Sequence, residues 1–240
     1  MPINMMISRL RVNSAVSDAD ADALKTIPSV VKDLPREAVL VREGDRPTNC
    51  IVMMRGFSYR SKVNEHGKRQ ILSFHPAGDM PDLHGLLLDR MDHDLTTLSS
   101  ATVAFIEHRH INRLIEDRPQ LARALWRETV VDASIFREWI VNLGTREAAA
   151  RLAHLLAELR TRLAAVGLTA DDEFAFPITQ NELAEALGIS SVHVNRVIQS
   201  FRAEGLIELT RDTVRLKDLE KLLELGGFNE FYLHQKNRNG

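Results

Sequence analysis

The spacing of apolar residues separates a strand-rich first half of the chain from a helical second half. Residues 38–107 carry short apolar runs such as AVLV, CIVMM and ATVAFI, and turn-forming stretches such as EGD and HPAGD separate them. The runs FSYRSKV and QILSF flank NEHGK, so we expect a β-hairpin in which Gly67 takes a positive φ. Upstream, Ser17 and the acidic residues after it predict a short helix that ends near Pro28. The first half therefore reads as a β domain of short strands.

Turn signals almost vanish between Asp117 and Leu143, which predicts one long helix. Residues that are apolar except for Thr129 recur at alternating spacings of four and three, at Ala122, Trp126, Thr129, Ala133, Phe136, Ile140 and Leu143. A second stripe, Val131, Ile135 and Trp139, lies on a neighbouring face. We expect one surface to pack on the β domain and the other on a second copy of the chain. The interface residues would be Trp126, Thr129, Ala133, Phe136 and Ile140. The alternative is a helix buried on both sides within one chain, because so few heptads are a weak coiled-coil signal.

The chain is expected to bend after this helix. Gly144 suits a helix C-cap and Thr145 suits a new N-cap, so we place a boundary there. The next helix, REAAARLAHLLAELRTRL, has a leucine face, and Gly167 ends it. That face consists of Leu152, Leu155, Leu156, Leu159 and Leu163.

The stretch ITQNELAEALGISSVHVNRVIQ predicts two short helices around a tight turn. Thr179 and Glu182 have the spacing of a capping box, Gly188 allows the turn, and Ser190 can cap the second helix. In the second helix the inward positions are Val194, Val197, Ile198 and Phe201. The outward positions are Ser191, Val192, Asn195, Arg196 and Gln199. This outer face carries no acidic residue, as a helix that enters the DNA major groove requires.

Downstream, GLIELTRDTVRLKD predicts a small hairpin with basic residues at Arg211 and Arg215. Helix, helix and hairpin in this order form a winged helix-turn-helix. A similar string also occurs in plain helical cores, but the capping box, the Gly turn and the acid-free face together favour DNA binding.

Composition constrains the partners only weakly. The chain has 31 Lys and Arg against 33 Asp and Glu, so contact with nucleic acid must come from a local patch. The single cysteine, Cys50, excludes an internal disulfide, a Cys-rich zinc site and an iron–sulfur cluster held by several thiolates, and we expect it to be buried. We find no export signal and no apolar run long enough to span a membrane, so we expect a cytoplasmic protein without membrane contact.

The stretch ITQNELAEALGISSVHVNRVIQSFRAEGLIEL resembles the DNA-binding motif of the bacterial regulators named after the cyclic-AMP receptor protein and the fumarate and nitrate reduction regulator, the CRP/FNR family. The stretch REGDRPTNCIVMMRGFSYRSKVNEHGKRQILSFHPAGD is similar, more weakly, to the jelly-roll effector domain of that family. The resemblance runs from about residue 20 to the closing FNEFYLH. It implies an α+β fold: a cyclic-nucleotide-binding-like β jelly-roll over residues 1–116, a dimerisation helix over 117–144, and a winged helix-turn-helix over 145–240.

The resemblance also implies a homodimer that binds a palindromic double-stranded DNA operator and contacts RNA polymerase. The family's base-reading positions fall on Ser191, Val192, Asn195 and Arg196. Contacts to the DNA backbone would come from Thr179, Gln180, Ser190, His193 and Arg211. Arg196 can bond to guanine, whereas Val192 departs from the glutamate common in the family, so the operator should differ from the best-known sites.

The effector domain departs from the cyclic-nucleotide binders of the family. They carry a Gly-Glu-Leu stretch and an Arg-Ser pair, and the corresponding region here reads GDMPDLHGLLLDRMDHDLTTLSS. A phosphate without its guanidinium partner would be costly to bury, so we expect no tight binding of cyclic AMP. An effector pocket would instead involve Asp82, His84, Asp92 and His93.

Histidines are frequent in this region, at His75, His84, His93, His108 and His110. A metal or haem site is conceivable, since His108 and His110 would alternate onto one strand face. No thiolate or acid-rich partner set accompanies them, and we therefore expect no metal. A sensor of another small molecule, haem or metal, and an adaptor that acts through protein contacts, remain as alternatives. An enzyme is not expected, because the chain has no phosphate-binding Gly loop, nucleophile elbow or HExxH motif.

Overall fold

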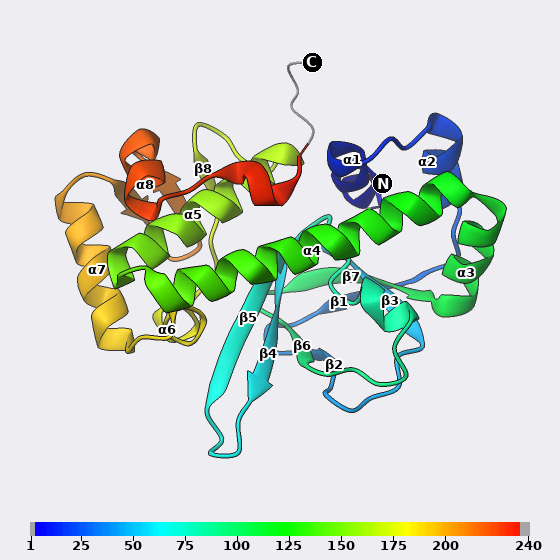
Figure 1. Cartoon of the computed structure of the whole chain (residues 1–240), viewed down its shortest axis with the longest axis horizontal. Helices are drawn as coiled ribbons and strands as arrows, with labels where there is room; N and C mark the ends of the chain where they lie inside the picture. Colours follow the sequence, from blue (N-terminus) through cyan, green and yellow to red (C-terminus); the bar gives the residue numbers. More distant parts are fainter. Residues whose placement is uncertain (1–2, 236–240) are drawn as a thin grey trace.

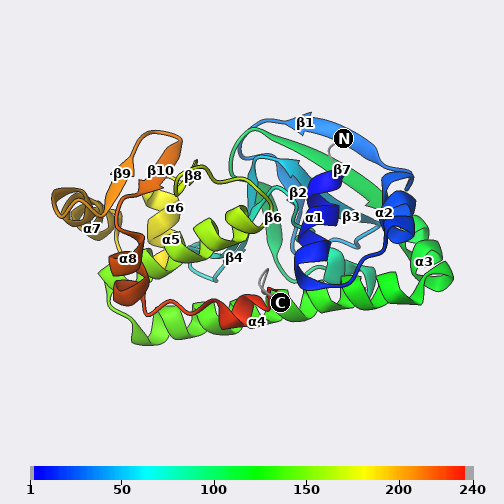
Figure 2. The same ribbon diagram turned by 90° about the horizontal axis from the view of Figure 1, so that it is seen from above.

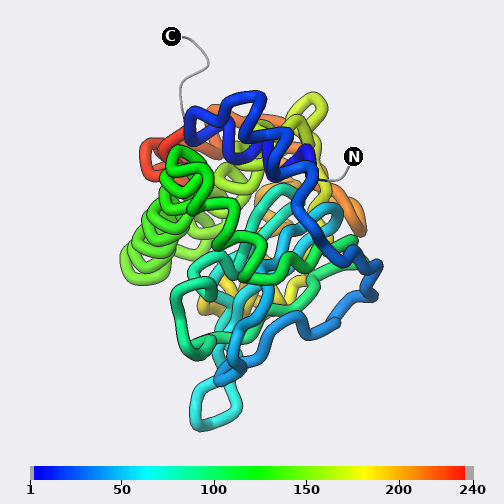
Figure 3. The backbone as a smooth tube through the Cα atoms, turned by 90° about the vertical axis from the view of Figure 1, so that its right-hand side faces the viewer, coloured from blue at the N-terminus to red at the C-terminus, as the bar shows by residue number. Residues whose placement is uncertain are grey.

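A computed structural model describes residues 3–235. Two antiparallel sheets form the first half of the molecule, one in the order β1-β7-β3 and the other in the order β2-β6-β4-β5 (Figure 1). The strands are β1 (Val30–Leu34), β2 (Val39–Val41), β3 (Asn49–Arg55), β4 (Phe57–Val63), β5 (Arg69–Pro76), β6 (Asp94–Thr97) and β7 (Ala101–Glu107). The predicted hairpin is β4–β5, and Gly67 in its turn has a φ of 73°. The hairpin projects from one end of the molecule (Figure 3).

The apolar runs predict five of these seven strands. The pattern misses β1 and β6, because neither shows a clear alternation of apolar and polar residues. Strand β1, VVKDL, is almost wholly exposed, and β6, DLTT, is short and mostly polar. Both are held by pairing with strands that the pattern does predict, β1 with β7 and β6 with β4. Pairing across the sheet, rather than local preference, therefore fixes them.

Two helices precede the sheets. The first, α1 (Asn4–Asn13), lies against the long helix α4 (Pro119–Thr145) (Figure 2). The second, α2 (Asp18–Lys25), begins at the predicted Ser17 cap, where Ser17 and Asp20 form a capping box. The prediction of a short helix ending near Pro28 is confirmed, whereas α1 was not predicted.

The expectation that His108 and His110 share a strand face is wrong. Strand β7 ends at Glu107, and helix α3 (His108–Asp117) begins at the next residue. From here the apolar residues Ile111, Leu114 and Ile115 recur at helical spacing, which favours a helix over a continued strand.

The long helix ends later than the sequence suggested. Gly144 does not take a left-handed conformation, and the hydroxyl of Thr145 donates a 2.8 Å hydrogen bond to the carbonyl oxygen of Val141. Thr145 is therefore still part of α4 rather than the cap of the next helix. The chain bends at Arg146, and α5 (Ala148–Ala165) follows.

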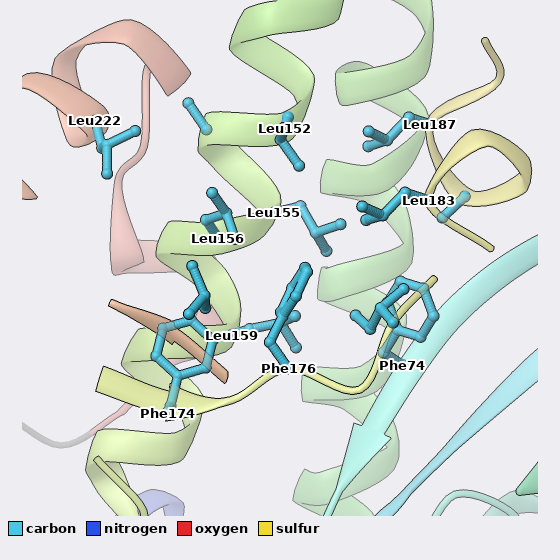
Figure 4. Packing of buried hydrophobic residues seen from close by; sticks show 14 of the residues in the cluster. Phe74, Leu152, Leu155, Leu156, Leu159, Phe174, Phe176, Leu183, Leu187 and Leu222 are labelled. Atoms are coloured by element: carbon cyan, nitrogen blue, oxygen red, sulfur yellow. The ribbon is translucent and has the colours of Figure 1, made fainter. Parts of the chain in front are cut away.

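The second half packs around α5. The remaining elements are β8 (Glu173–Ala175), α6 (Gln180–Leu187), α7 (Ser191–Ala203), β9 (Ile207–Leu209), β10 (Thr213–Leu216), α8 (Leu219–Gly226) and the short 3₁₀ helix η2 (Glu230–Leu233). The five predicted leucines of α5 are all buried, and they pack between α6 and α8 (Figure 4). Strands β8, β10 and β9 form a small sheet beside α7. Among residues 3–235, no helix is both long and apolar enough to cross a bilayer.

The two halves share one apolar cluster. Phe74 of β5 and Trp139 of α4 meet edge to face, with ring centroids 5.9 Å apart. The same cluster continues into Leu183 of α6 and Leu155 of α5 (Figure 4). The helix-turn-helix therefore lies against the β sheets of its own chain.

Candidate DNA-binding surface and effector pocket

The turn between α6 and α7 is built by local capping. The backbone N–H of Thr179 donates to the Glu182 carboxylate at 2.7 Å, and the Thr179 hydroxyl accepts from the Glu182 N–H at 3.3 Å. Gly188 takes a φ of 65°, and the Ser190 hydroxyl accepts from the N–H of His193. The predicted caps and turn are confirmed, and they fix the angle at which α7 leaves α6.

Helix α7 buries one face and exposes the other. The four predicted inward residues are buried, while Val192 is 69% exposed and Asn195, Arg196 and Gln199 are exposed. Ser191, in the first turn, is half buried. The predicted base-reading residues thus lie along one surface of a single helix. That surface contains no carboxylate, because α7 itself has none.

The predicted backbone-contact residues surround this surface. Thr179, Gln180, Ser190 and His193 are all exposed at the beginnings of α6 and α7. The amide of Asn195 donates to the side-chain oxygen of Gln180 at 3.2 Å, so these two residues are oriented together.

The tip of the β9–β10 hairpin carries Arg211, which is exposed. Arg215, the other basic residue predicted there, is paired to Glu173 of β8 at 2.7 Å. The charge of Arg215 is therefore already partly neutralised, and Arg211 is the more exposed cation of this hairpin.

Helix α4 has one buried and one exposed apolar face. Val131, Ile135 and Trp139 are buried against the same chain, as predicted. The other face contains the five predicted interface residues and is called the seam of α4 below. On this seam, Trp126 is 70% exposed and Ile140 is 69% exposed. The remaining predicted interface residues, Thr129, Ala133 and Phe136, are half buried. The alternative of a helix covered on both sides within one chain is therefore wrong.

A cavity of 340 Å³ lies between α4 and the β sheets. Its walls come from β4 and β5, from the segment between β5 and β6, and from one side of α4. The lining residues are Arg60, Lys62, Leu72, His84, Leu88, Asp92, His93, Thr129, Asp132, Ala133 and Phe136. Of the four predicted effector residues, His84, Asp92 and His93 are brought together here.

The fourth predicted effector residue, Asp82, does not line this cavity. Asp82 is fully buried, and its carboxylate accepts a 2.7 Å hydrogen bond from the backbone N–H of Ile51 on β3. Burial raises the pKa of Asp82 to about 7, against the opposing effect of that hydrogen bond. The residue holds the segment after β5 to the sheet, and its prediction as a pocket residue is wrong.

Arg60 is the most buried of the charged cavity residues that the sequence analysis did not predict. It lies in the middle of β4 and is 2% exposed. Its Nη1 donates to Asp132 of α4 at 2.7 Å, its Nε donates to the carbonyl oxygen of Pro81 at 2.9 Å, and its guanidinium lies 5.1 Å from the Phe136 ring centre. An arginine inside a strand with buried neighbours was the available signal, because such a charge must find a buried partner.

The two cavity histidines are electrically neutral near pH 7. Burial and then the charge of Arg60 lower the pKa of His84 to about 4. The same two causes lower the pKa of His93. His93 approaches Asp92 through Nδ1 at 2.7 Å, and its ring centre lies 5.2 Å from that of His84.

A buried ionic cluster joins the β sheets to α5. Arg162 of α5 donates to Asp79, which follows β5, and also to Glu158 at 3.0 Å. Although burial opposes its ionisation, Arg162, His75 and Arg9 hold the pKa of Asp79 below its usual range. Closer to the turn, Arg69 of β5 is paired to Glu185 of α6 at 2.8 Å, and Arg36 to Glu182. These contacts orient the helix-turn-helix relative to the cavity.

Comparison with protein families gives two matches that together span more than half of the chain. Residues 31–118 match the cyclic nucleotide-binding domain, and residues 150–225 match the Crp-like helix-turn-helix domain. The first match covers the sheets and α3, and the second runs from α5 to α8.

Curated relatives match over most of their length. The transcriptional activator protein FnrA of Stutzerimonas stutzeri is 27% identical, over 92% of this chain and 90% of its own. An anaerobic regulatory protein of Aggregatibacter actinomycetemcomitans is 25% identical, over 95% of this chain and 88% of its own.

Solved structures show the same fold. FixK2 from Bradyrhizobium japonicum aligns with a TM-score of 0.76 at 19% identity, over 85% of this chain and all of its own. A transcriptional regulator of the CRP family from Thermus thermophilus aligns with a TM-score of 0.59 at 23% identity, over 82% of this chain and 97% of its own. The predicted fold class is confirmed: a β-rich cyclic-nucleotide-binding-like domain, a long helix and a C-terminal helix-turn-helix. The chain belongs to the CRP/FNR family, which consists of transcription regulators rather than enzymes.

Proposed function

We propose that this regulator acts as a homodimer on a palindromic operator, with one α7 helix in the major groove of each half-site. The observation that carries the proposal is the outer face of α7, which is exposed, polar apart from Val192, and free of carboxylates. An α-helix fits the major groove of B-DNA, and acidic groups on its outer face would be repelled by the phosphates.

The exposed seam of α4 supports the dimer. Trp126 and Ile140 leave large apolar side chains in solvent, and Val130 and Val141 flank them at 47% and 44% exposure. Covering such a stripe with the same stripe of a second copy removes apolar surface from water on both chains. The interface would consist of Trp126, Thr129, Ala133, Phe136 and Ile140, and each dimer would present two α7 helices.

Each of the four base-reading residues of this surface has a contact that suits its chemistry. Arg196 bonds to a guanine, Asn195 and Ser191 read neighbouring bases, and Val192 packs against a thymine methyl. Thr179, Gln180, Ser190, His193 and Arg211 hold the phosphates and set the register. The protein would work in the cytoplasm and contact RNA polymerase there. We divide the chain into an effector domain ending near residue 116, the dimerisation helix, and the DNA-binding domain, which begins at the bend at Arg146.

The cavity favours an effector other than cyclic AMP. Its buried guanidinium, Arg60, is already bonded to Asp132 and to the Pro81 carbonyl, and Asp92 contributes a second carboxylate to the lining. A cyclic phosphate would have to break the Arg60–Asp132 pair and then lie beside the released Asp132 charge. A cluster of the kind that several thiolates hold does not fit either, because the one cysteine, Cys50, is buried and burial raises the pKa of its thiol. Calorimetry with cyclic AMP should show no binding, and micromolar affinity would contradict this.

The decisive experiment is selection of DNA from a random pool by the purified chain. We expect a palindrome whose half-sites are about one helical turn apart, which corresponds to roughly 10–10.5 base pairs. Arg196→Ala should weaken binding by about 1–3 kcal/mol and relax the preference at one base pair. Arg109→Ala, an exposed arginine on α3, is the matched control and should bind as the parent does.

Other outcomes would decide against the proposal. An unchanged footprint with Arg196→Ala would remove that residue from base reading. No enrichment at all would favour the adaptor that acts through protein contacts. Repeating the selection with cell metabolites tests the second candidate, a sensor of another small molecule, haem or metal, which the presence of the cavity favours.

A further inference from the structure

Three side chains in the cavity form an incomplete coordination set. His84 lies on the 3₁₀ helix η1 (Leu83–Leu86), and Asp92 and His93 lie just before β6. One ligand atom from each of the three residues lies within 4.8 Å of the corresponding atoms of the other two. We propose that His84, Asp92 and His93 bind a divalent first-row transition-metal ion such as Zn²⁺. The proposal names a ligand for the effector cavity, and its regulatory meaning rests on the proposed function.

The donor chemistry selects this class of ion. Imidazole nitrogens suit Zn²⁺, Ni²⁺, Co²⁺ and Fe²⁺, whereas Mg²⁺ and Ca²⁺ prefer sites made of oxygen ligands alone. Bonds of about 2.0–2.2 Å to a shared ion place neighbouring donors roughly 3–4 Å apart. The donors of the set, all within 4.8 Å of one another, therefore need only small movements to close on an ion. Asp92 can move, since its side chain is 75% exposed.

His93 supplies an independent sign of a missing partner. The residue is 5% exposed, and its Nε2 is buried without a hydrogen-bond partner among the described residues. A buried polar atom without a hydrogen-bond partner is unfavourable, and most buried polar atoms in folded proteins have one. Coordination through Nε2 would satisfy this atom. Asp92, now 2.7 Å from Nδ1, would have to turn its carboxylate from Nδ1 toward the ion to complete the set.

The two basic side chains near the three residues are each bonded to an acidic partner. Arg60 is the buried cation whose field reaches both rings, and it is paired to Asp132. Lys62 donates to the Glu43 carboxylate at 2.9 Å and to the backbone carbonyl oxygen of Asp92 at 2.6 Å. Among the described residues, the side-chain carboxylate of Asp92 is paired with the ring of His93.

The opposite wall of the cavity connects the site to the dimer helix. Thr129, Ala133 and Phe136 line it, and all three belong to the seam of α4. Three protein donors leave at least one coordination position for water or a small ligand in the cavity. Binding of the ion would thus alter the surroundings of the helix on which the proposed dimer depends.

The test titrates the metal-free full-length chain with ZnCl₂ by calorimetry and with CoCl₂ by visible absorption. We expect one ion per chain with a dissociation constant in the micromolar range or lower. His93→Ala and Asp92→Asn should each weaken binding at least tenfold. His66→Ala removes an exposed histidine that also lies beside a carboxylate, 3.6 Å from Glu65, and it should leave binding unchanged.

Asp92→Asn changes an exposed residue, so its thermal unfolding should match the parent's and its result should not depend on a folding defect. Absence of Zn²⁺ binding below about 100 µM, or equal binding by the parent, His93→Ala and Asp92→Asn, would overturn the proposal. Gel shifts in chelator and in ZnCl₂ measure DNA binding separately. DNA binding without any Zn²⁺ binding supports the proposed regulator and contradicts the metal site. Zn²⁺ binding without DNA binding in either condition supports the metal site and contradicts the proposed function.

Discussion

Val192 is the apolar residue on the exposed face of α7, and it is 69% exposed. A methyl-bearing side chain can pack on thymine but cannot accept a hydrogen bond from cytosine. Val192→Glu should therefore move the selected half-site toward cytosine at one position, with a discrimination of about 1–3 kcal/mol. Selection from a random pool measures this shift. Val192→Gln, similar in size but uncharged, is the control, and an identical consensus for all three proteins would contradict the assignment.

His75 couples the stability of the protein to pH. It is 2% exposed between Ser73 and Asp79; burial and then Arg60 lower its pKa to about 4, although Asp79 and Asp132 oppose the shift. Because this value lies below the ordinary 6.5, the unfolded chain binds more protons between pH 4 and 6.5. The contribution of His75, up to about 3 kcal/mol, is complete above pH 6.5 and is lost as the pH falls toward 4.

Urea unfolding between pH 7.5 and 5 measures this contribution. We expect His75→Gln to lose less stability than the parent over that range, since one group that must gain a proton has been removed. His66→Gln, exposed on the hairpin turn, should follow the parent. Equal slopes for parent and His75→Gln would show that His75 does not carry this dependence.

At the level of single residues, the sequence predicted the features that depend on near neighbours. The caps at Thr179 and Ser190 follow from spacing within one turn, and the structure confirms both. The Arg60–Asp132 pair joins residues 72 positions apart, so local spacing contained no sign of it. Asp82 lies two residues before His84 in the sequence, but its side chain is directed to β3 and does not reach the pocket.

Helices α5 and α8 pack closely at Gly226. A Cβ on Gly226 would lie 2.7 Å from the backbone nitrogen of His154 and 2.9 Å from its Cα. Because backbone atoms cannot turn away as a side chain can, Gly226→Ala should force the helices apart and cost about 1–3 kcal/mol. Chemical denaturation measures the loss.

Gly144 provides the matched control for Gly226. It lies within α4, and a Cβ there would meet no heavy atom within 4 Å. Gly144→Ala should raise stability by up to about 1 kcal/mol, because alanine is the better helix former. A stable Gly226→Ala variant would mean that the two helices can separate without cost.

Among the elements, the sequence predicted those with a clear apolar period. The leucine face of α5, the β4–β5 hairpin and the length of α4 all follow from such periods. Strands β1 and β6 and the start of α3 were missed, because pairing and packing with distant segments determine them. The end of α4 was misplaced for a similar reason: glycine permits a helix end but does not impose one.

The proposed dimer makes a prediction for the whole molecule. Replacing Trp126 and Ile140 with glutamate places charges on the exposed seam of α4, so the variant should sediment as a monomer and lose affinity for a palindromic site. Phe231→Glu alters another large exposed side chain, 78% exposed on η2, and should sediment as the parent does. A parent that is monomeric at micromolar concentration would contradict the dimer.

The relative placement of the two halves was outside the reach of sequence reasoning. It depends on contacts such as Arg69 with Glu185, 116 positions apart, and Arg162 with Asp79, 83 positions apart. The sequence around each of these residues does not indicate its distant partner, and only the folded chain brings the partners together.

The shared apolar cluster and the Arg162–Asp79 pair have a practical consequence for dissecting this regulator. A fragment that stops at Arg146 would leave Phe74 and Trp139 without the helices that cover them, and a fragment that starts there would leave the Arg162 guanidinium without Asp79. Each fragment should therefore be less stable against unfolding than the intact polypeptide. Heating the intact polypeptide should accordingly give one calorimetric peak rather than two.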